Sequence, residues 1–185
     1  MLWLVIGLVV FLGVHVFSSL RVQREALIAR IGAGPYKGVY SALSLAGFVL
    51  IVIGMGRTEP VALWTAPEWG AVAAFWITPF AFVSLVSGYV PGKIRRATAH
   101  PMLWGVALWA LAHLLANGDL AGLLLFGGFG AYALYAMWSQ TRRGAKPSQS
   151  PGSPLYDLLA IAIGLALWAA AVYFHASFSG VPLAW

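Results

Sequence analysis

Long apolar stretches alternate with short polar segments along this chain. A helix needs about 20 mostly apolar residues to cross the hydrocarbon core of a bilayer, because each residue adds about 1.5 Å of rise. Six stretches come near this length, at residues 1–19, 38–56, 69–90, 100–116, 120–138 and 155–178. The pattern predicts an all-α fold, a polytopic integral membrane bundle of six transmembrane helices that forms one domain over residues 1–185.

The composition agrees with this prediction. Hydrophobic residues make up 61% of the chain and charged residues 9%, and the mean hydropathy is +0.85. So few charged side chains cannot cover a compact core with a water-soluble surface. The lipid bilayer is therefore the expected partner of the outer surface. We expect no nucleic-acid partner, because the chain has no soluble basic domain to bind phosphates.

The basic residues predict how the helices are oriented. Ten of the eleven Lys and Arg residues follow the first, third and fifth predicted spans, and only Arg57 follows the second. Basic loops stay on the cytoplasmic side of a membrane, so both termini are expected on the non-cytoplasmic side. No basic residue precedes the first span, and this order favours a retained membrane anchor over a cleaved signal peptide.

Proline, glycine and charged segments mark the predicted spans. Pro79 is expected to kink the third span, with neighbouring helices satisfying the carbonyl that it frees. The glycine-rich segment 127–130 allows close packing of a second helix or of a flat ligand. Residues 19–32 fit either a cytoplasmic extension of the first helix or an interfacial helix. Residues 141–154 read as a flexible cytoplasmic loop.

Histidine is the main candidate for chemistry inside the membrane. The chain has no cysteine, which excludes disulfides, thiolate metal ligands and thiol nucleophiles. Its five acidic residues lie in predicted loops or at span ends, so none is placed mid-membrane as a general base or proton relay. Ionisable groups inside a membrane are costly and are functional candidates by default. The candidates that remain are His15, His100, His113 and His175.

The four histidines differ in expected depth. His100 begins the fourth span at the cytoplasmic interface, and His175 closes the sixth near the outer interface, where a structural role is the default. At about 1.5 Å per residue, His15 lies roughly 9 Å inside the cytoplasmic edge and His113 a similar distance inside the outer edge. His100 and His113 share a helix but not a face, because thirteen residues at about 100° each leave them roughly 140° apart.

His113 fits two roles, a satisfied core histidine or a ligand. It shares its helix face with Ala110, whose small side chain is expected to leave room beside the ring. A neutral imidazole in apolar surroundings suits a metal ion or haem iron, but no second ligand set such as HExxH supports a bare zinc site. The expected depths in the membrane leave three pairs of histidines open as metal ligands: His15 with His113, His15 with His100, and His113 with His175.

The segment HPMLWGVALWALAHLLANGD, residues 100–119, makes the chain resemble a known family. Together with GVHVFSSLR around His15 and with RIGAGPYKGVYSALSLAGFVLIVIG, it resembles the NnrU family of bacterial inner-membrane proteins. The resemblance covers the chain up to the linker and the last helix. It implies a multi-pass protein of the inner membrane that is associated with denitrification and nitric-oxide metabolism. The family usually has arginine directly before the motif histidine, where this chain has Ala99.

The NnrU family is similar in turn to zeta-carotene isomerase, a membrane enzyme that uses haem b to isomerise a cis double bond. By that resemblance haem b is the implied cofactor, His15 and His113 are its implied iron ligands, and His100 matches another motif histidine. The isomerase has a redox-linked cysteine at the position of Ala110, so a cysteine-switched mechanism does not carry over. The implied function is redox, nitric-oxide-related or isomerase chemistry, with an apolar small-molecule substrate that enters from the lipid.

Two other functions stay open from the sequence. A membrane methyltransferase of the isoprenylcysteine or phospholipid type also has a His-Pro motif at the cytoplasmic start of a late helix. That class usually adds a downstream acidic residue, whereas here no glutamate follows Glu68 and Asp157 stands alone after the linker. The other alternative is a non-enzymatic assembly or regulatory protein. It would bind a membrane protein partner or a second copy through its nine Trp residues and its glycine-rich segment.

Overall fold

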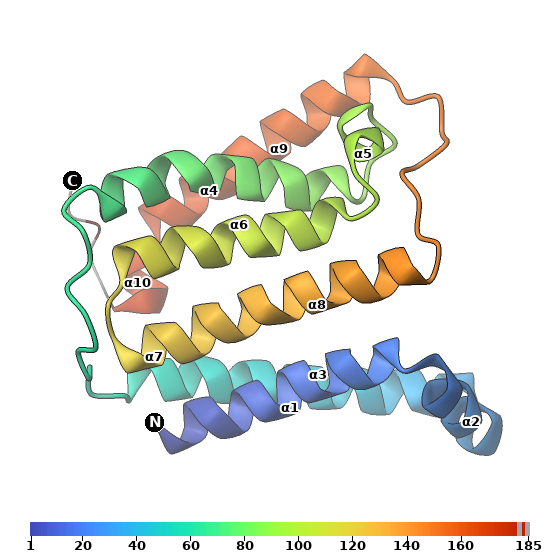
Figure 1. Ribbon diagram of the computed structural model, residues 1–185, viewed down its shortest axis with the longest axis horizontal. Coiled ribbons are helices and arrows are strands. Elements are labelled where there is room, and N and C mark those ends of the chain that lie inside the picture. The colour runs from blue at the N-terminus through green and yellow to red at the C-terminus, as the bar shows by residue number, and fades with distance from the viewer. Residues whose placement is uncertain (181–182, 184–185) are drawn as a thin grey trace. The chain divides into compact units, whose positions relative to one another are not determined.

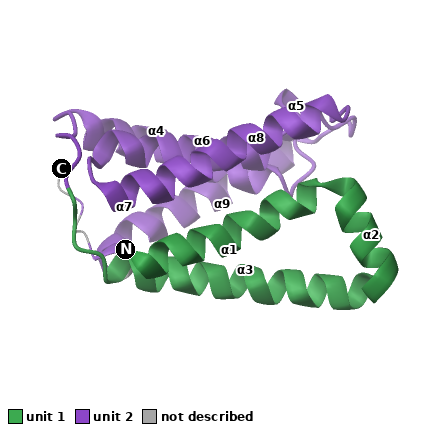
Figure 2. Ribbon diagram, turned by 60° about the horizontal axis from the view of Figure 1, so that its bottom comes forward, with its two compact units in different colours: residues 1–61 green, residues 62–185 purple. Residues whose placement is uncertain are grey.

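The structure is a computed structural model that describes residues 1–180 and residue 183. The described residues form helices and connecting segments without a β-strand, apart from an isolated bridge between Ala62 and Asp119. The chain divides into two compact units, Met1–Val61 and Ala62–Trp185, which Figure 2 shows in different colours. The all-α prediction is confirmed, and the single membrane domain over residues 1–185 stays a prediction.

Unit 1 is a helical hairpin with a shorter helix at its turn. Helix α1 (Leu2–Ser19) and helix α3 (Ala33–Gly56) pack side by side in opposite directions, and helix α2 (Arg21–Ile31) joins them (Figure 2). At the open end of the hairpin the ammonium group of Met1 donates a hydrogen bond of 2.8 Å to Thr58 Oγ1. This bond ties the start of α1 to the segment that follows α3.

Helix α2 is separate from α1. The backbone of Leu20 leaves the helical conformation, with φ −82° and ψ 81°, and its N–H bonds to the carbonyl of Phe17. None of the residues of α2 is buried. Residues 19–32 therefore do not extend the first helix, and the interfacial position of this segment stays a prediction.

The two long helices of unit 1 meet at glycines. A Cβ atom at Gly7 of α1 would lie 2.6 Å from a backbone nitrogen of α3, and one at Gly47 of α3 would lie 2.7 Å from the nitrogen of Phe11. At Gly54 it would collide with the backbone of Leu4. In lipid, where apolar side chains gain little by contacting each other, such close backbone packing stabilises helix pairs.

Unit 2 contains four longer helices, each of which contacts the next in the order α9, α4, α6 and α8 (Figure 1). Its helices in chain order are α4 (Gly70–Ser87), α5 (Ile94–Ala97), α6 (Pro101–Ala116), α7 (Leu120–Gly122), the π-helix η1 (Leu123–Gly127), α8 (Gly128–Arg142), α9 (Pro154–Tyr173) and α10 (His175–Ser179). Helices α7, η1 and α8 follow one another without a break and form one rod. Irregular backbone separates Arg142, the last residue of this rod, from Pro154 at the start of α9, and the flexible cytoplasmic loop at 141–154 stays a prediction.

Helix α4 is in contact with both α6 and α9 through glycines of those two helices. A Cβ atom at Gly105 of α6 would lie 2.8 Å from the carbonyl oxygen of Ala81, and one at Gly164 of α9 would lie 2.8 Å from a backbone Cα atom of α4. The hydroxyl of Ser84 in α4 also donates a hydrogen bond of 2.7 Å to the carbonyl of Pro101 at the start of α6. The contact between α4 and α6 therefore combines van der Waals packing with a hydrogen bond between the two helices.

Pro79 lies inside α4 and has no N–H to donate to the carbonyl of Phe75. The hydroxyl of Thr78 lies 2.9 Å from the carbonyl oxygen of Ala74 and 3.4 Å from that of Phe75. The indole N–H of Trp168 in α9 donates a hydrogen bond of 3.0 Å to this hydroxyl. A side chain of α4 itself thus approaches the freed carbonyl, and the neighbouring helix α9 contributes Trp168.

Five helices of the described residues are long and apolar enough to cross a membrane: Leu2–Ser19, Ala33–Gly56, Gly70–Ser87, Leu120–Arg142 and Pro154–Tyr173. The remaining predicted span, residues 100–116, is helix α6, an apolar helix of 16 residues. Its length of about 24 Å is less than the hydrocarbon core of about 30 Å. Five of the six predicted spans thus agree with helices of the structure, and the fourth predicted span, residues 100–116, stays a prediction.

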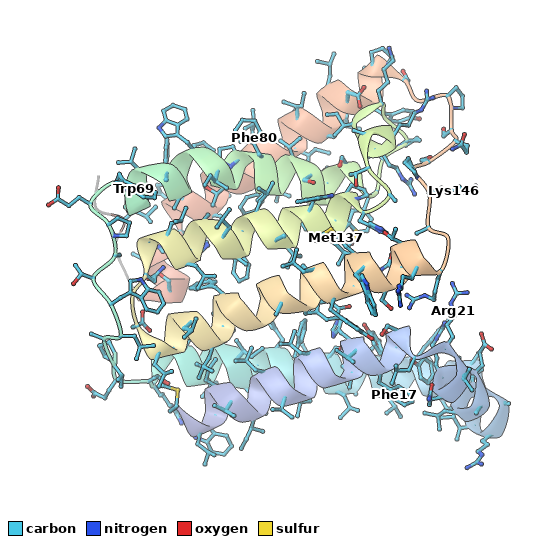
Figure 3. All side chains as sticks on the ribbon, viewed as in Figure 1. Phe17, Arg21, Trp69, Phe80, Met137 and Lys146 are labelled. Atoms are coloured by element: carbon cyan, nitrogen blue, oxygen red, sulfur yellow. The ribbon has the colours of Figure 1, made fainter. Side chains whose placement is uncertain are left out.

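Large apolar side chains cover much of the outer surface. Trp69, directly before α4, and Trp76 and Phe80 within it are all more than half exposed; Figure 3 labels Trp69 and Phe80. The most buried side chains of unit 2 are small: Ser87, Ala81, Ala110, Ala112, Ala133 and Ala160. Lipid around the helices explains this distribution, because soluble monomers rarely expose apolar surface on this scale.

One end of unit 2 carries its basic residues. Two loops meet there: the N–H of Ile94 donates a hydrogen bond of 2.8 Å to Asp157 Oδ1, and Arg96 donates one of 2.9 Å to the carbonyl of Pro151. The basic residues of these loops are Lys93, Arg95, Arg96, Arg142, Arg143 and Lys146. Their position at one end agrees with the alternating charge pattern. The side of the membrane on which this end and both termini lie stays a prediction, and the C-terminal residue is outside the described residues.

Single cysteines test this orientation, because the chain has none of its own. We predict that Gln149→Cys reacts with a membrane-impermeant maleimide only after spheroplasts are lysed, since its loop carries basic residues that stay inside. Glu59→Cys, in the exposed segment after α3, is expected to react in intact spheroplasts. Labelling of Gln149→Cys before lysis would contradict the predicted orientation.

Gly7→Ala tests the close contact between α1 and α3. We expect this variant to lower the free energy of unfolding by about 1–3 kcal/mol, the usual cost of overpacking a tight contact. Gly13→Ala in the same helix is the matched control, because a Cβ atom there meets no other atom within 4 Å. The control should be neutral or slightly stabilised through its higher helix propensity. Unfolding in detergent measures both, and equal effects would contradict the contact.

Candidate functional site

Helix α6 holds two histidines at its two ends. It begins at Pro101, directly after His100, where proline is favoured because its missing N–H would have no partner in the helix. It ends at Ala116, and the side-chain amide of the next residue, Asn117, donates a hydrogen bond of 2.8 Å to the carbonyl of His113. His113 thus lies in the last turn. The predicted difference in face stays a prediction, because the two rings contact opposite ends of one rod, His100 at Thr141 and His113 at Phe126.

The ring of His113 is packed among aromatic side chains. It stacks on Phe126 of η1, with ring centres 4.4 Å apart and 23° between the planes. Its own helix contributes Trp109, whose ring centre lies 5.1 Å away. Trp109 in turn meets Phe126 and Phe129 edge-on, at 5.0 and 5.7 Å. These contacts hold the imidazole in one orientation.

The hydrogen bonding of His113 defines its tautomer. Nδ1 lies 2.8 Å from the carbonyl oxygen of Trp109. A carbonyl oxygen only accepts, so Nδ1 carries the proton and donates. The lone pair of the neutral ring is then at Nε2, which forms no hydrogen bond within the described part of the chain. Metal-ligating histidines have this same arrangement, with the other ring N–H donated to a carbonyl or carboxylate.

A π-helical segment places Phe126 against His113. Residues Leu123–Gly127 form this segment between α7 and α8, and its Phe126 is buried. Short π-helical turns inside α-helices are rare and are frequent at functional sites. Our sequence analysis missed the segment. The local signal is the pair Gly127 and Gly128 directly after Phe126, since glycine weakens the preference for regular α-helix.

Ala110 occupies a packing position beside this site. A Cβ atom at Gly130 of α8 would lie 3.3 Å from the Cβ of Ala110, so the predicted close packing at the glycine-rich segment is confirmed there. Ala110 is only 1% exposed. It therefore fills the contact between α6 and α8, and the expectation that it leaves room beside the His113 ring is wrong.

His175 is the second histidine at this end of unit 2. It begins α10, and its ring centre lies 6.5 Å from that of His113 with 22° between the planes. Figure 1 shows α10 beside the ends of α6 and α7. Of the three pairs that depth left open, the pair His113 and His175 is the one that unit 2 brings together.

His100 lies at the opposite end of α6 and does not share a site with His113. It is 8% exposed, and its Nε2 lies 2.8 Å from the hydroxyl of Thr141 in α8. Its buried Nδ1 has no hydrogen-bond partner in the described residues. Thirteen residues of helix place the two histidines about 20 Å apart. His100 therefore links the start of α6 to the end of α8, a contact that sequence analysis did not predict.

His15 lies in α1 of unit 1. Its Nδ1 is 2.6 Å from the carbonyl oxygen of Phe11, so it also donates from Nδ1 and has its lone pair at Nε2. The ring stacks on Phe11 with centres 4.3 Å apart, and it contacts Tyr40 of α3 at 5.4 Å. The pairs that join His15 with His113 or with His100 link the two units, and they stay predictions.

The helices and their internal imidazoles define a multi-pass membrane protein with a histidine site in its helical bundle. Residues 3–183 match the family described as NnrU protein, and the chain belongs to the NnrU family. This match confirms the resemblance and extends it through the linker and the last helix. Neither the curated proteins nor the solved structures include a match to the chain.

Thr141→Val tests the link between His100 and α8. Removal of the hydroxyl leaves Nε2 of the buried His100 without its partner, so we expect a loss of about 1–3 kcal/mol in the free energy of unfolding. Thr141→Ser keeps the hydroxyl and is expected to retain most of the stability. Unfolding in detergent measures both variants, and a valine variant as stable as the serine variant would contradict this role.

Proposed function

We propose that this protein is a haem b protein of the bacterial inner membrane, in which His113 supplies an iron ligand. The observation that carries this proposal is the tautomer of His113. Its Nδ1–H is bonded to the carbonyl of Trp109, which leaves the lone pair on Nε2. A neutral imidazole with its lone pair at Nε2 is the form in which histidine binds haem iron.

The donor set around His113 fits a metalloporphyrin better than a bare metal ion. The described residues contain no group of three or more His, Asp or Glu side chains that could hold an ion. A porphyrin supplies four nitrogens itself and asks the protein for only one or two axial ligands. The aromatic rings of Trp109 and Phe126 beside His113 provide the apolar contacts that a flat macrocycle needs.

A bound haem would supply an iron centre that transfers electrons or binds a small ligand. The chain's own residues then have definable roles. The carbonyl of Trp109 fixes the ring of His113, and Phe126 holds it from one face. The redox, nitric-oxide-related or isomerase role is proposed from the family resemblance, as is an apolar substrate that enters from lipid. The family resemblance also makes His15 a further candidate ligand. His100 positions α6.

The methyltransferase alternative is less consistent with the site. That class usually adds a downstream acidic residue near its cofactor, and here Asp157 accepts a hydrogen bond from the backbone N–H of Ile94. A non-enzymatic partner role is the remaining alternative. It would be favoured if the purified protein had no haem and retained a stoichiometric membrane protein partner or a second copy.

His113→Ala tests the proposal through the absorption spectrum. We predict that the wild-type protein, purified in detergent from cells supplied with haem, has a Soret band that this variant loses. Leu111→Ala is the matched control, because Leu111 lies on the same helix and is exposed to lipid. The control should keep the band. A wild-type protein without a Soret band despite sufficient haem would overturn the proposal.

A further inference from the structure

Helix α2 lies across the closed end of the hairpin in unit 1. Figure 2 shows it running from the end of α1 to the start of α3, and it contacts both helices. Leu20 leaves the helical conformation directly before α2, and Gly32 follows it with φ 87°, a conformation that favours glycine. Because α1 and α3 are long and apolar enough to cross a membrane, a helix across their ends is placed along the bilayer surface.

One face of α2 is turned toward the hairpin. Arg24, Leu27 and Ile28 are half-buried, and their spacing of three and four residues places them on the same side of the helix. The guanidinium of Arg24 lies over the ring of Tyr36 near the start of α3, with Cζ 5.9 Å from the ring centre. This distance is within the range of a cation–π contact. The face toward the hydrocarbon is thus apolar apart from one arginine, which contacts an aromatic ring.

Two exposed arginines flank this half-buried face. Nine residues at about 100° each place Arg21 and Arg30 roughly 180° apart around the helix, one on each side of the face. Both side chains are exposed. A long basic side chain at such a boundary keeps its apolar stem near the hydrocarbon and extends its charged group to the head groups. There a guanidinium can donate two parallel N–H groups to one phosphate.

The closed end of the hairpin has an excess of positive charge. Four basic residues and one acidic residue lie between positions 20 and 37, namely Arg21, Arg24, Arg30, Lys37 and Glu25. Their net charge is +3. The segment 57–61, which follows α3 at the open end, instead has one residue of each sign, Arg57 and Glu59. Basic residues beside a membrane are attracted to anionic lipids over about one Debye length, so the charge of unit 1 favours such lipids at α2.

We propose that α2 is a binding surface for anionic phospholipids, with Arg21 and Arg30 at the level of the lipid phosphates. Zwitterionic lipids present the same phosphate without a net charge, so the excess of basic residues selects the anionic ones. An acidic protein segment would match the charge but not the apolar face between the two arginines. The inference concerns unit 1 and does not rest on the proposed function.

Quenching by spin-labelled lipids tests this inference. The chain has no cysteine, so Ile31→Cys, at an exposed position of α2, carries a single bimane probe in phosphatidylcholine bilayers. Phosphatidylglycerol and phosphatidylcholine, each with a nitroxide near the top of the acyl chain, are added separately. We expect the phosphatidylglycerol to bind beside the probe about threefold more tightly or better. Salt at about 1 M, where screening acts over about 3 Å, should weaken this preference.

Two variants assign the preference to α2. Arg21→Gln combined with Arg30→Gln should bring the two lipids to nearly equal binding. Arg57→Gln is the matched control, because it removes the same kind of exposed side chain at the other end of the same hairpin. This control should keep the preference. Far-UV circular dichroism checks that each variant keeps its helices, and the salt dependence of the wild type decides if the double variant does not fold.

Four results would overturn the inference. They are equal quenching by the two lipids in the wild type, a preference that salt does not weaken, a preference that survives in the folded double variant, and an equal loss in Arg57→Gln. Absence of quenching by either lipid also overturns it and would favour an acidic protein partner at α2. None of these results depends on the Soret band, so the haem proposal is tested separately.

Discussion

The hydrogen bond from His113 Nδ1 to the carbonyl of Trp109 is the interaction on which the site depends. In hydrocarbon a polar atom without a partner costs several kcal/mol, so the ring N–H must find an acceptor inside the protein. The nearest one is the carbonyl four residues earlier on the same helix. This bond satisfies one nitrogen and, by doing so, decides which nitrogen keeps the lone pair. His15 follows the same rule with Phe11, so a local constraint of helices in lipid decides the tautomer of each imidazole.

The same constraint explains why so many polar contacts in this protein are local. Thr78 bonds back to its own helix beside Pro79, and Asn117 bonds to the carbonyl of His113 at the end of α6. Contacts between helices depend mainly on the close approach of backbones at Gly7, Gly47 and Gly105. The difference between local polar contacts and close backbone contacts between helices has a physical cause. In lipid, apolar side chains have no water to escape, so helices associate through shape and a small number of hydrogen bonds.

The sequence predicted the helices well because hydropathy reports directly on the bilayer. Most ends agree with the structure within a few residues, and two of the basic loops that the charge pattern assigned to one side meet at one end of unit 2. It could not predict the π-helical segment, because a register change of one residue leaves the apolar pattern intact. Neither the contact of His100 with Thr141 nor that of His113 with His175 could be found from depth alone. Depth fixes position along the membrane normal, whereas these contacts depend on which helices are neighbours.

The surroundings favour histidine over other side chains for the proposed ligand role. A carboxylate or thiolate would bring a negative charge into the apolar bundle, and burial of an unpaired charge is expensive. Asp119 and Asp157 both lie at helix ends, where they accept backbone N–H groups. They are therefore already partnered at the ends of unit 2. An imidazole offers a lone pair without a charge, and it needs only one carbonyl to be satisfied on its other side. In a chain without cysteine, histidine is the side chain that can bring a strong nitrogen donor into lipid at so small a cost.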